Sequence, residues 1–254
     1  MTINNQFFSM NYQKKIDNLL RKQPFSDNGQ SMDPVYGYAE SIAVLENCIA
    51  VVSDLKSGTS RIFSGAFAEV LGLTGYSSEN SIWEKEIIAM MTDTECDVKY
   101  MAELRFYNFL RQLPRNKRSE YYLATVLRFR DRQSRALDVL HRLYYRYDDA
   151  SDAVRYGLCL YSPAVFNLPA RSVVINSVTG KWEELSEVTD NRILSKREKQ
   201  VLALIERGHT SRAIAEELCI SKNTVSRHRQ EILAKLQTHN STEACRRAKQ
   251  LNLI

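Results

Sequence analysis

Over the C-terminal quarter of the chain, apolar residues recur every three or four positions, which is the spacing of helices that bury one face. Ser195 and Glu198 have the S-x-x-E spacing of a capping box, and Ile193 is placed to act as its hydrophobic staple. The apolar stripe that follows consists of Val201, Leu202, Leu204 and Ile205. Gly208 suits the positive φ with which many helices end. The pattern therefore predicts a helix over about 196–207.

Three more helical segments follow, and a residue that favours helix N-termini precedes each. Thr210, Ser221 and Asn240 (the last with Glu243 three positions on) open the segments SRAIAEEL, KNTVSRHRQEIL and STEACRRAKQ. A short helix, a tight turn and a longer helix form a helix-turn-helix unit. Because an α-helix fits the major groove of DNA, the helix that begins at Lys222 is predicted to enter it.

Charge is distributed unevenly along the chain in a way that agrees with this prediction. Residues 191–254 hold 13 Lys+Arg and 6 Asp+Glu, a net of +7, out of chain totals of 35 and 30. By subtraction, residues 1–190 hold 22 basic and 24 acidic side chains, a net of −2. The C-terminal quarter thus carries the whole positive excess, which favours a nucleic-acid partner over a solvated surface with a chance imbalance.

The helix that begins at Lys222 has side chains suited to reading DNA. Its groove-facing side carries Lys222, Asn223, Ser226, Arg227, Arg229 and Gln230. Arg and Gln present paired hydrogen-bonding groups to base edges, whereas Lys, Ser and Thr contact phosphates. For each residue taken singly, the alternative is a solvated helix face. His228 is expected to have a structural or phosphate-contacting role, because no nucleophile or carboxylate pattern accompanies it.

Residues 194–254 resemble a LuxR-type output domain, the four-helix DNA-binding unit at the C-termini of many bacterial regulators. The matching positions are Leu194, Ser195, Arg197, Glu198, Val201, Leu202, Gly208, Ile214, Ala215, Leu218, Ile220, Ser221, Thr224, Val225, His228, Ile232, Lys235, Leu236, Glu243 and Ala244. By matching position, the resemblance implies that Ser226, Arg227 and Gln230 read bases. It likewise implies that Lys222, Thr224 and Lys235 hold the DNA backbone.

The chain departs from this family's pattern at three places. Family members often have Lys where Ser226 precedes Arg227, Arg where Ser241 stands, and Asn-Lys-Glu where residues 211–213 read Ser-Arg-Ala. Apolar and capping positions are intact, so the departures concern the target sequence rather than the fold. The fourth helix resembles the family's dimerisation element; the alternative is that it only closes the core.

The N-terminal 190 residues show a different pattern of elements. Two amphipathic helices come first, one marked by Tyr12, Ile16, Leu19 and Leu20 and the other by Ile42 and Leu45. The predicted order after them is strands at 49–54 and 61–63, helices at about 65–71, 82–91 and 97–112, and strands at 121–130, 137–147 and 154–160. The last three strands are spaced as an antiparallel meander.

That order of elements, together with the sequence IAVVSDLKSGTSRIFSGAFAEVLGL, resembles a PAS domain over roughly 45–165. In the family, two strands joined by a turn lead to a short helix that ends in a Leu-Gly pair, here Leu71 and Gly72. The resemblance implies a sheet curled around a pocket, which in this family binds a ligand, haem or flavin or serves only as a dimer interface. No cofactor is evident, and a small-molecule ligand remains open. His141 is interpreted as a half-exposed strand residue rather than a haem ligand, and residues 143–147 as sheet packing.

The predicted fold class is α+β, with a PAS-like antiparallel sheet and helices followed by an all-α helix-turn-helix domain. The predicted divisions are a helical segment at 1–46, the PAS-like domain at 47–168, a hairpin or linker at 169–190 and the DNA-binding domain at 191–254. The polar stretch SEVTDN marks the last boundary.

Composition is that of a soluble globular protein, with 44% hydrophobic and 26% charged residues and no apolar run long enough to span a membrane. The N-terminus lacks the pattern of a secretory signal, so a cytoplasmic location is expected. The five cysteines, which lack C-x-x-C spacing, are expected to be small buried residues and not zinc ligands: Cys48, Cys96, Cys159, Cys219 and Cys245.

The sequence therefore predicts a one-component transcriptional regulator and not an enzyme, since it has no nucleophile–base pair, metal cluster or phosphate loop. Its expected partners are double-stranded promoter DNA, a second copy of the chain and, less directly, RNA polymerase. One alternative is a phosphorylated response regulator, but no acidic pair precedes Asp54 and the strands do not alternate with helices. Another is a sigma-factor-like protein, which would need a helical polymerase-binding domain where β-rich sequence stands. The effector, the operator and the sign of regulation are not indicated.

Overall fold

The computed structural model describes residues 3–25, 34–131, 133–185, 194–236, 238 and 240–250. The chain divides into two compact units, Met1–Glu184 and Leu185–Ile254, and each is described by itself. No helix among the described residues is both long and apolar enough to cross a membrane.

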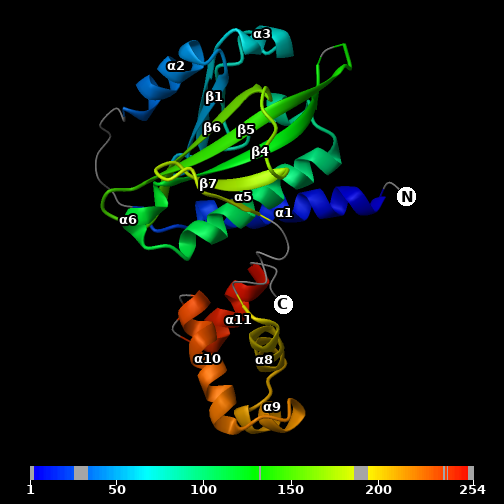
Figure 1. Ribbon diagram of the computed structural model, residues 1–254, viewed down its shortest axis with the longest axis vertical. Helices are drawn as coiled ribbons and strands as arrows, with labels where there is room; N and C mark the ends of the chain where they lie inside the picture. The colour runs from blue at the N-terminus through cyan, green and yellow to red at the C-terminus, as the bar shows by residue number, and fades with distance from the viewer. Residues whose placement is uncertain are drawn as a thin grey trace. The chain divides into compact units, whose positions relative to one another are not determined.

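The first unit is built on one antiparallel sheet of eight strands (Figure 1). The strands are β1 (Ile49–Asp54), β2 (Thr59–Ser64), β3 (Ser78–Glu79), β4 (Tyr121–Arg130), β5 (Ala136–Tyr147), β6 (Val154–Pro163), β7 (Ser172–Asn176) and β8 (Trp182–Glu184). Their spatial order is β3-β2-β1-β6-β5-β4-β7-β8, and every described pair is antiparallel. The predicted meander of the three long strands is confirmed. The alternating strand–helix order of a phosphorylated receiver is not found in this part of the chain.

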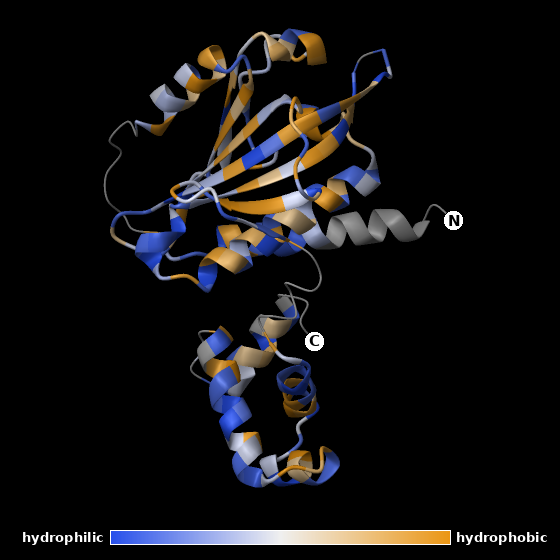
Figure 2. Cartoon of the chain, in the orientation of Figure 1, coloured by the Kyte–Doolittle hydropathy of each residue, from blue (hydrophilic) through white to orange (hydrophobic). Residues whose placement is uncertain are grey.

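Helices cover both faces of this sheet (Figure 1). They are α1 (Ile3–Arg21), α2 (Val35–Leu45), α3 (Phe67–Leu71), α4 (Lys85–Ile88), α5 (Asp93–Arg111) and α6 (Arg115–Arg118). The short helix α2 packs on β1 and β2, whereas α5 packs on β4 and is itself covered by α1. Hydrophilic and hydrophobic residues alternate along the long strands (Figure 2), as expected where successive side chains point to opposite faces.

Several details of the first unit differ from the predictions. The helix expected at about 82–91 is helical only over Lys85–Ile88. In α2 the buried face is Val35, Ala39 and Ala43, at i, i+4 and i+8, whereas Leu45 is 80% exposed. Two of the three buried residues are alanines. Of the two residues that marked the predicted apolar face, Ile42 packs partly against the core and Leu45 does not. His141 was expected to be half-exposed but is fully buried. Every second side chain of β5 points toward α5, and His141 is one of these.

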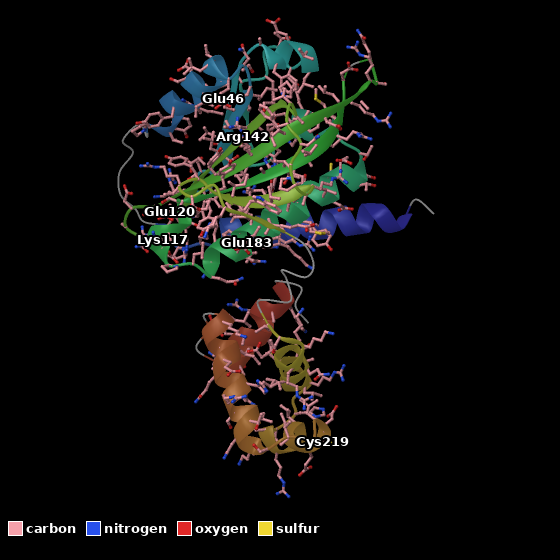
Figure 3. All side chains as sticks on the ribbon, in the orientation of Figure 1. Glu46, Lys117, Glu120, Arg142, Glu183 and Cys219 are labelled. Atoms are coloured by element: carbon pink, nitrogen blue, oxygen red, sulfur yellow. The ribbon has the colours of Figure 1, made fainter. Side chains whose placement is uncertain are left out.

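The segment 169–190, predicted to be a hairpin or a linker, forms a hairpin over the part that the structure describes. Strands β7 and β8 pair with each other, and β7 also pairs with β4, for example Leu123 with Val174. The hairpin therefore adds β7 and β8 to one edge of the sheet, next to β4. Between α2 and β5, Arg142 donates to Glu46, which caps the C-terminal end of α2; both residues are labelled in Figure 3.

Gly65, which follows β2, lies against the C-terminal end of α2. A Cβ at this position would lie 2.1 Å from the carbonyl oxygen of Ala43 and 2.8 Å from backbone atoms of Asn47. Because these contacts are to backbone, the substitution Gly65→Ala is expected to destabilise the first unit by about 1–3 kcal/mol. Chemical denaturation of the full chain measures this. Gly37→Ala within α2 is the control: nothing lies within 4 Å of a Cβ there, so no loss of stability is expected.

Beneath α5, the core of the first unit contains charged residues. Lys99 Nζ lies 2.7 Å from Glu103 Oε1 and 3.2 Å from Glu84 Oε1, and all three side chains are buried. Burial raises the pKa of Glu103 and, together with the Lys99 charge, lowers that of His141 well below its ordinary value. Burial opposes the charged form of Lys99, but the two carboxylates outweigh it and raise its pKa. The buried lysine is therefore an ammonium group and His141 is neutral.

The second unit contains α8 (Lys196–Glu206), α9 (Ser211–Glu217), α10 (Lys222–Leu236) and α11 (Ser241–Gln250). Their apolar faces meet in one core, whose most buried members are Leu194, Val201, Leu202, Ile214, Val225, Ile232, Leu236, Ala244 and Ala248. The helices begin and end within a few residues of the predicted positions, because the caps and the apolar stripes agree with each other.

Candidate nucleic-acid interface

The capping box that opens α8 is present as predicted. The Ser195 hydroxyl accepts from the Glu198 backbone N–H at 3.2 Å, and the Glu198 carboxylate accepts from the Ser195 N–H at 2.6 Å. Gly208 ends the helix with a φ of 85°. The proposed staple residue, Ile193, lies outside the described residues. The box fixes the direction of α8, against which α10 packs.

Side-chain caps open both helices of the helix-turn-helix pair, α9 and α10. Thr210 accepts from the Ala213 N–H, and Ser221 accepts from the Thr224 N–H at 3.0 Å. Cys219 lies in this turn with a φ of 52° and is exposed, as Figure 3 shows. The prediction that all five cysteines are buried is therefore wrong for Cys219, which lies in the tight turn after α9; the other four are buried.

Helix α10 has one face in the core and one face in solvent. Val225, Ile232 and Leu236 are buried. The exposed members of the predicted DNA-binding set are Lys222, Asn223, Ser226, Arg227 and Gln230. Their positions, at i, i+1, i+4, i+5 and i+8, form one continuous stripe on the helix. Arg227 is only loosely held, since its Nε lies 3.5 Å from Glu231 Oε1 and both side chains are exposed to solvent.

Arg229 is the first of three residues predicted to contact DNA that have hydrogen-bond partners within the unit. Its guanidinium donates to the hydroxyl of Ser211 at 3.2 Å and to that of Ser241 at 2.9 Å, so it joins α10 to the starts of α9 and α11. Both serines stand where the chain departs from the family pattern. The structure thus links two separate sequence departures through one arginine, and residue types taken one by one could not have indicated this.

Lys235 and Thr224 also have partners within the unit. Lys235 Nζ donates to both carboxylate oxygens of Glu198, at 2.7 and 2.8 Å, and the Thr224 and Ser221 hydroxyls share a hydrogen bond. Glu198 is almost completely buried. A buried carboxylate needs a cationic or hydrogen-bonding partner. The cap motif identified Glu198, but a partner 37 positions along the chain could not be found from local spacing.

The substitution Lys235→Met is expected to destabilise the second unit by about 1–3 kcal/mol, because it leaves the buried Glu198 carboxylate with fewer donors. Hydrogen exchange of the full chain, followed by mass spectrometry on peptides from α8 and α10, measures the local loss. Lys222→Met is the matched control, since Lys222 is exposed at the start of the same helix. Equal protection in the two variants would show that the Lys235 pair contributes no stability.

The same pair makes the unit sensitive to acid. Burial of Glu198 raises its pKa, but the hydrogen bonds from Lys235 and Ser195 outweigh burial and hold the pKa below the ordinary 4.5. A carboxyl whose folded pKa is depressed stabilises the fold above its unfolded pKa and loses that contribution as the pH falls through the folded value. The stabilisation is therefore complete at neutral pH and is lost below about pH 4.5.

His228 is mostly buried on the flank of α10. Its Nδ1 lies 3.3 Å from Glu231 Oε2 on the next turn. The imidazole therefore positions Glu231, which also faces Arg227, and the structural role predicted for His228 agrees with this placement.

Comparisons with known proteins locate the second unit in a family. Residues 192–248 match the family described as "Bacterial regulatory proteins, luxR family". The oxygen regulatory protein NreC of Staphylococcus aureus (strain JH9) is 37% identical over 73 residues, which are 28% of this chain and 34% of that protein. The chain therefore spans about a third of the length of the curated relatives it matches.

Two solved structures are similar over most of their length but at low identity. The phage VqmA–DPO complex is 16% identical, covers 85% of this chain and 88% of its own, and has a TM-score of 0.32. The Escherichia coli SdiA structure is also 16% identical, covers 96% and 98%, and has a TM-score of 0.25. At such scores these likenesses establish nothing further about the chain. The family match and the capped helices at 194–250 together identify the C-terminal unit of this chain as a LuxR-type helix-turn-helix domain.

Proposed function

We propose that this protein is a one-component transcriptional regulator that reads promoter DNA with α10. The observation that carries the proposal is the exposed stripe of Lys222, Asn223, Ser226, Arg227 and Gln230, opposite a fully packed face. Base edges are read by side chains with paired hydrogen-bonding groups, which Arg227, Asn223 and Gln230 supply. Lys222, at the first turn of the helix, supplies a phosphate contact.

The three engaged residues have positioning roles in this proposal. Arg229 sets the angle of α10 to α9 and α11, and Lys235 sets it to α8. Thr224 completes the cap at the helix start. Rigid support of this kind keeps a recognition surface in register with its target. Arg229 and Lys235 carry further N–H donors, so contacts with DNA are compatible with these bonds.

The first unit is proposed to be a PAS-like domain that senses a small molecule or pairs two copies of the chain. This rests on the order of β1, β2, α3 and the later strands, and on Gly72, which follows Leu71 and ends α3 with a φ of 71°. A homodimer would present two copies of α10 to paired half-sites. Helix α11 is the proposed contact between DNA-binding units, and the protein is proposed to act in the cytoplasm, with RNA polymerase as a further partner.

Fluorescence anisotropy with genomic promoter fragments tests the proposed function. The full chain should bind at least one fragment more tightly than a scrambled duplex, and the affinity should fall steeply as salt rises, because bound phosphates release counterions. Salt-insensitive binding, or equal affinity for every duplex, would contradict sequence-specific reading by α10. Sedimentation of the chain with and without the selected fragment measures whether two copies assemble.

A further inference from the structure

The interior of the first unit brings together three potential metal ligands from three different elements. Glu103 comes from α5, His141 from β5 and Cys159 from β6. One carboxylate oxygen, one imidazole nitrogen and the sulfur all lie within 4.8 Å of one another, and the three residues are buried. The register explains the meeting: Leu143 pairs with Cys159 and His141 with Tyr161, so β5 and β6 turn these side chains to the face covered by α5.

His141 gives a second, independent indication of a bound group. Among the described residues, neither of its ring nitrogens has a hydrogen-bond partner, although the side chain is fully buried. Its closest carboxylate oxygen, Glu103 Oε1, is 3.7 Å from Nε2. Buried polar atoms are nearly always paired, so an imidazole with both nitrogens unpaired calls for an explanation. A metal ion bonded to one of these nitrogens accounts for that atom.

Charge balance favours the same explanation. The cluster around His141 has two carboxylates, Glu84 and Glu103, and a single ammonium group, Lys99. With both carboxylates ionised, one negative charge is uncompensated inside a water-excluded core, which is costly. If a divalent cation binds and Cys159 releases its thiol proton to solvent as the metal–sulfur bond forms, three negative charges face three positive ones.

We propose that Glu103, His141 and Cys159 bind a divalent transition-metal ion, zinc being the best match to this set of donors. Carboxylate, imidazole and thiolate together are ligands of zinc, whereas magnesium and calcium select oxygen. Lys99 remains beside the site, because it donates to Oε1 of Glu103 and a carboxylate has a second oxygen. The ion joins α5 to the sheet. No C-x-x-C motif signals this site, since its ligands are far apart in sequence.

The test uses the full chain, stripped of metal with a chelator, titrated with zinc and then freed of excess. We expect about one zinc per chain. Titration with cobalt(II) should produce the intense near-ultraviolet charge-transfer band of a thiolate–cobalt bond. Absence of retained zinc together with absence of this band would overturn the proposal, whatever the behaviour of the variants.

The variants assign the site. Cys159→Ser should abolish the thiolate band, and Glu103→Gln should keep the band but weaken zinc binding by at least about 100-fold. Cys48→Ser removes another fully buried cysteine elsewhere in the core and should change neither. His228→Gln tests the group of Glu198, His228 and Glu231 in the second unit, and an unchanged spectrum is expected. A band that survives Cys159→Ser overturns the assignment. If Cys159→Ser does not fold, the loss of zinc affinity in Glu103→Gln tests the site.

Discussion

Replacing Lys222 and Arg227 together by alanine should lower the affinity of the chain for its promoter fragment by roughly 100-fold, because each lost contact to a base edge or phosphate costs about 1–3 kcal/mol. Both side chains are exposed on the stripe of α10, and neither supports the core. The fold should therefore remain intact while binding is lost. Anisotropy titrations at several salt concentrations, with circular dichroism as the check on folding, measure the effect.

The two single variants separate the roles of these residues. Lys222→Ala should weaken binding to all duplexes alike and reduce the salt dependence by about one counterion, as a phosphate contact does. Arg227→Ala should relax the preference for one base pair. Lys196→Ala removes the same charge from an exposed position at the start of α8 and is the control for long-range attraction. If the double variant binds no more weakly than Lys196→Ala, then α10 is not the reading helix.

The C-terminal unit could be predicted closely because its information is local. The capping residues Ser195, Thr210 and Ser221 lie within three positions of the groups that they bond. What escaped prediction depends on contacts between distant positions. The bonds of Arg229 to Ser211 and Ser241, and of Lys235 to Glu198, required the packing of four helices against one another.

In the N-terminal unit the order of strands could be predicted but the identity of buried residues could not. Alternation along β5 indicates two faces, and nothing in the pattern decides which face packs on α5. His141 was therefore assigned to a half-exposed position, although it lies in the interior beside Glu103. Lys99 and Glu103 lie i, i+4 on α5 and look like a solvated surface pair by spacing alone. Only the tertiary structure shows that this face of α5 is buried.

That buried pair should be the most sensitive position in the first unit. The substitution Lys99→Met removes the ammonium group that lies between Glu84 and Glu103 and leaves two carboxylates facing each other without a cation. Breaking a buried ion pair by removing one partner costs about 3–5 kcal/mol. Guanidinium denaturation of the full chain in metal-free buffer measures the fall in the free energy of unfolding.

The substitution Lys117→Met is the matched control, because Lys117 and Glu120 form an exposed pair 2.6 Å apart on the same unit (Figure 3). Water screens that pair and solvates either partner left alone, so little change is expected. Adding Glu103→Gln to Lys99→Met should recover part of the lost stability, since it removes one of the two unpaired charges. If Lys99→Met and Lys117→Met unfold at the same denaturant concentration, Glu103 must already hold a proton in the native protein. A protonated Glu103 needs no ammonium group to neutralise it. The comparison of the two variants therefore distinguishes a protonated carboxyl group from a buried ion pair.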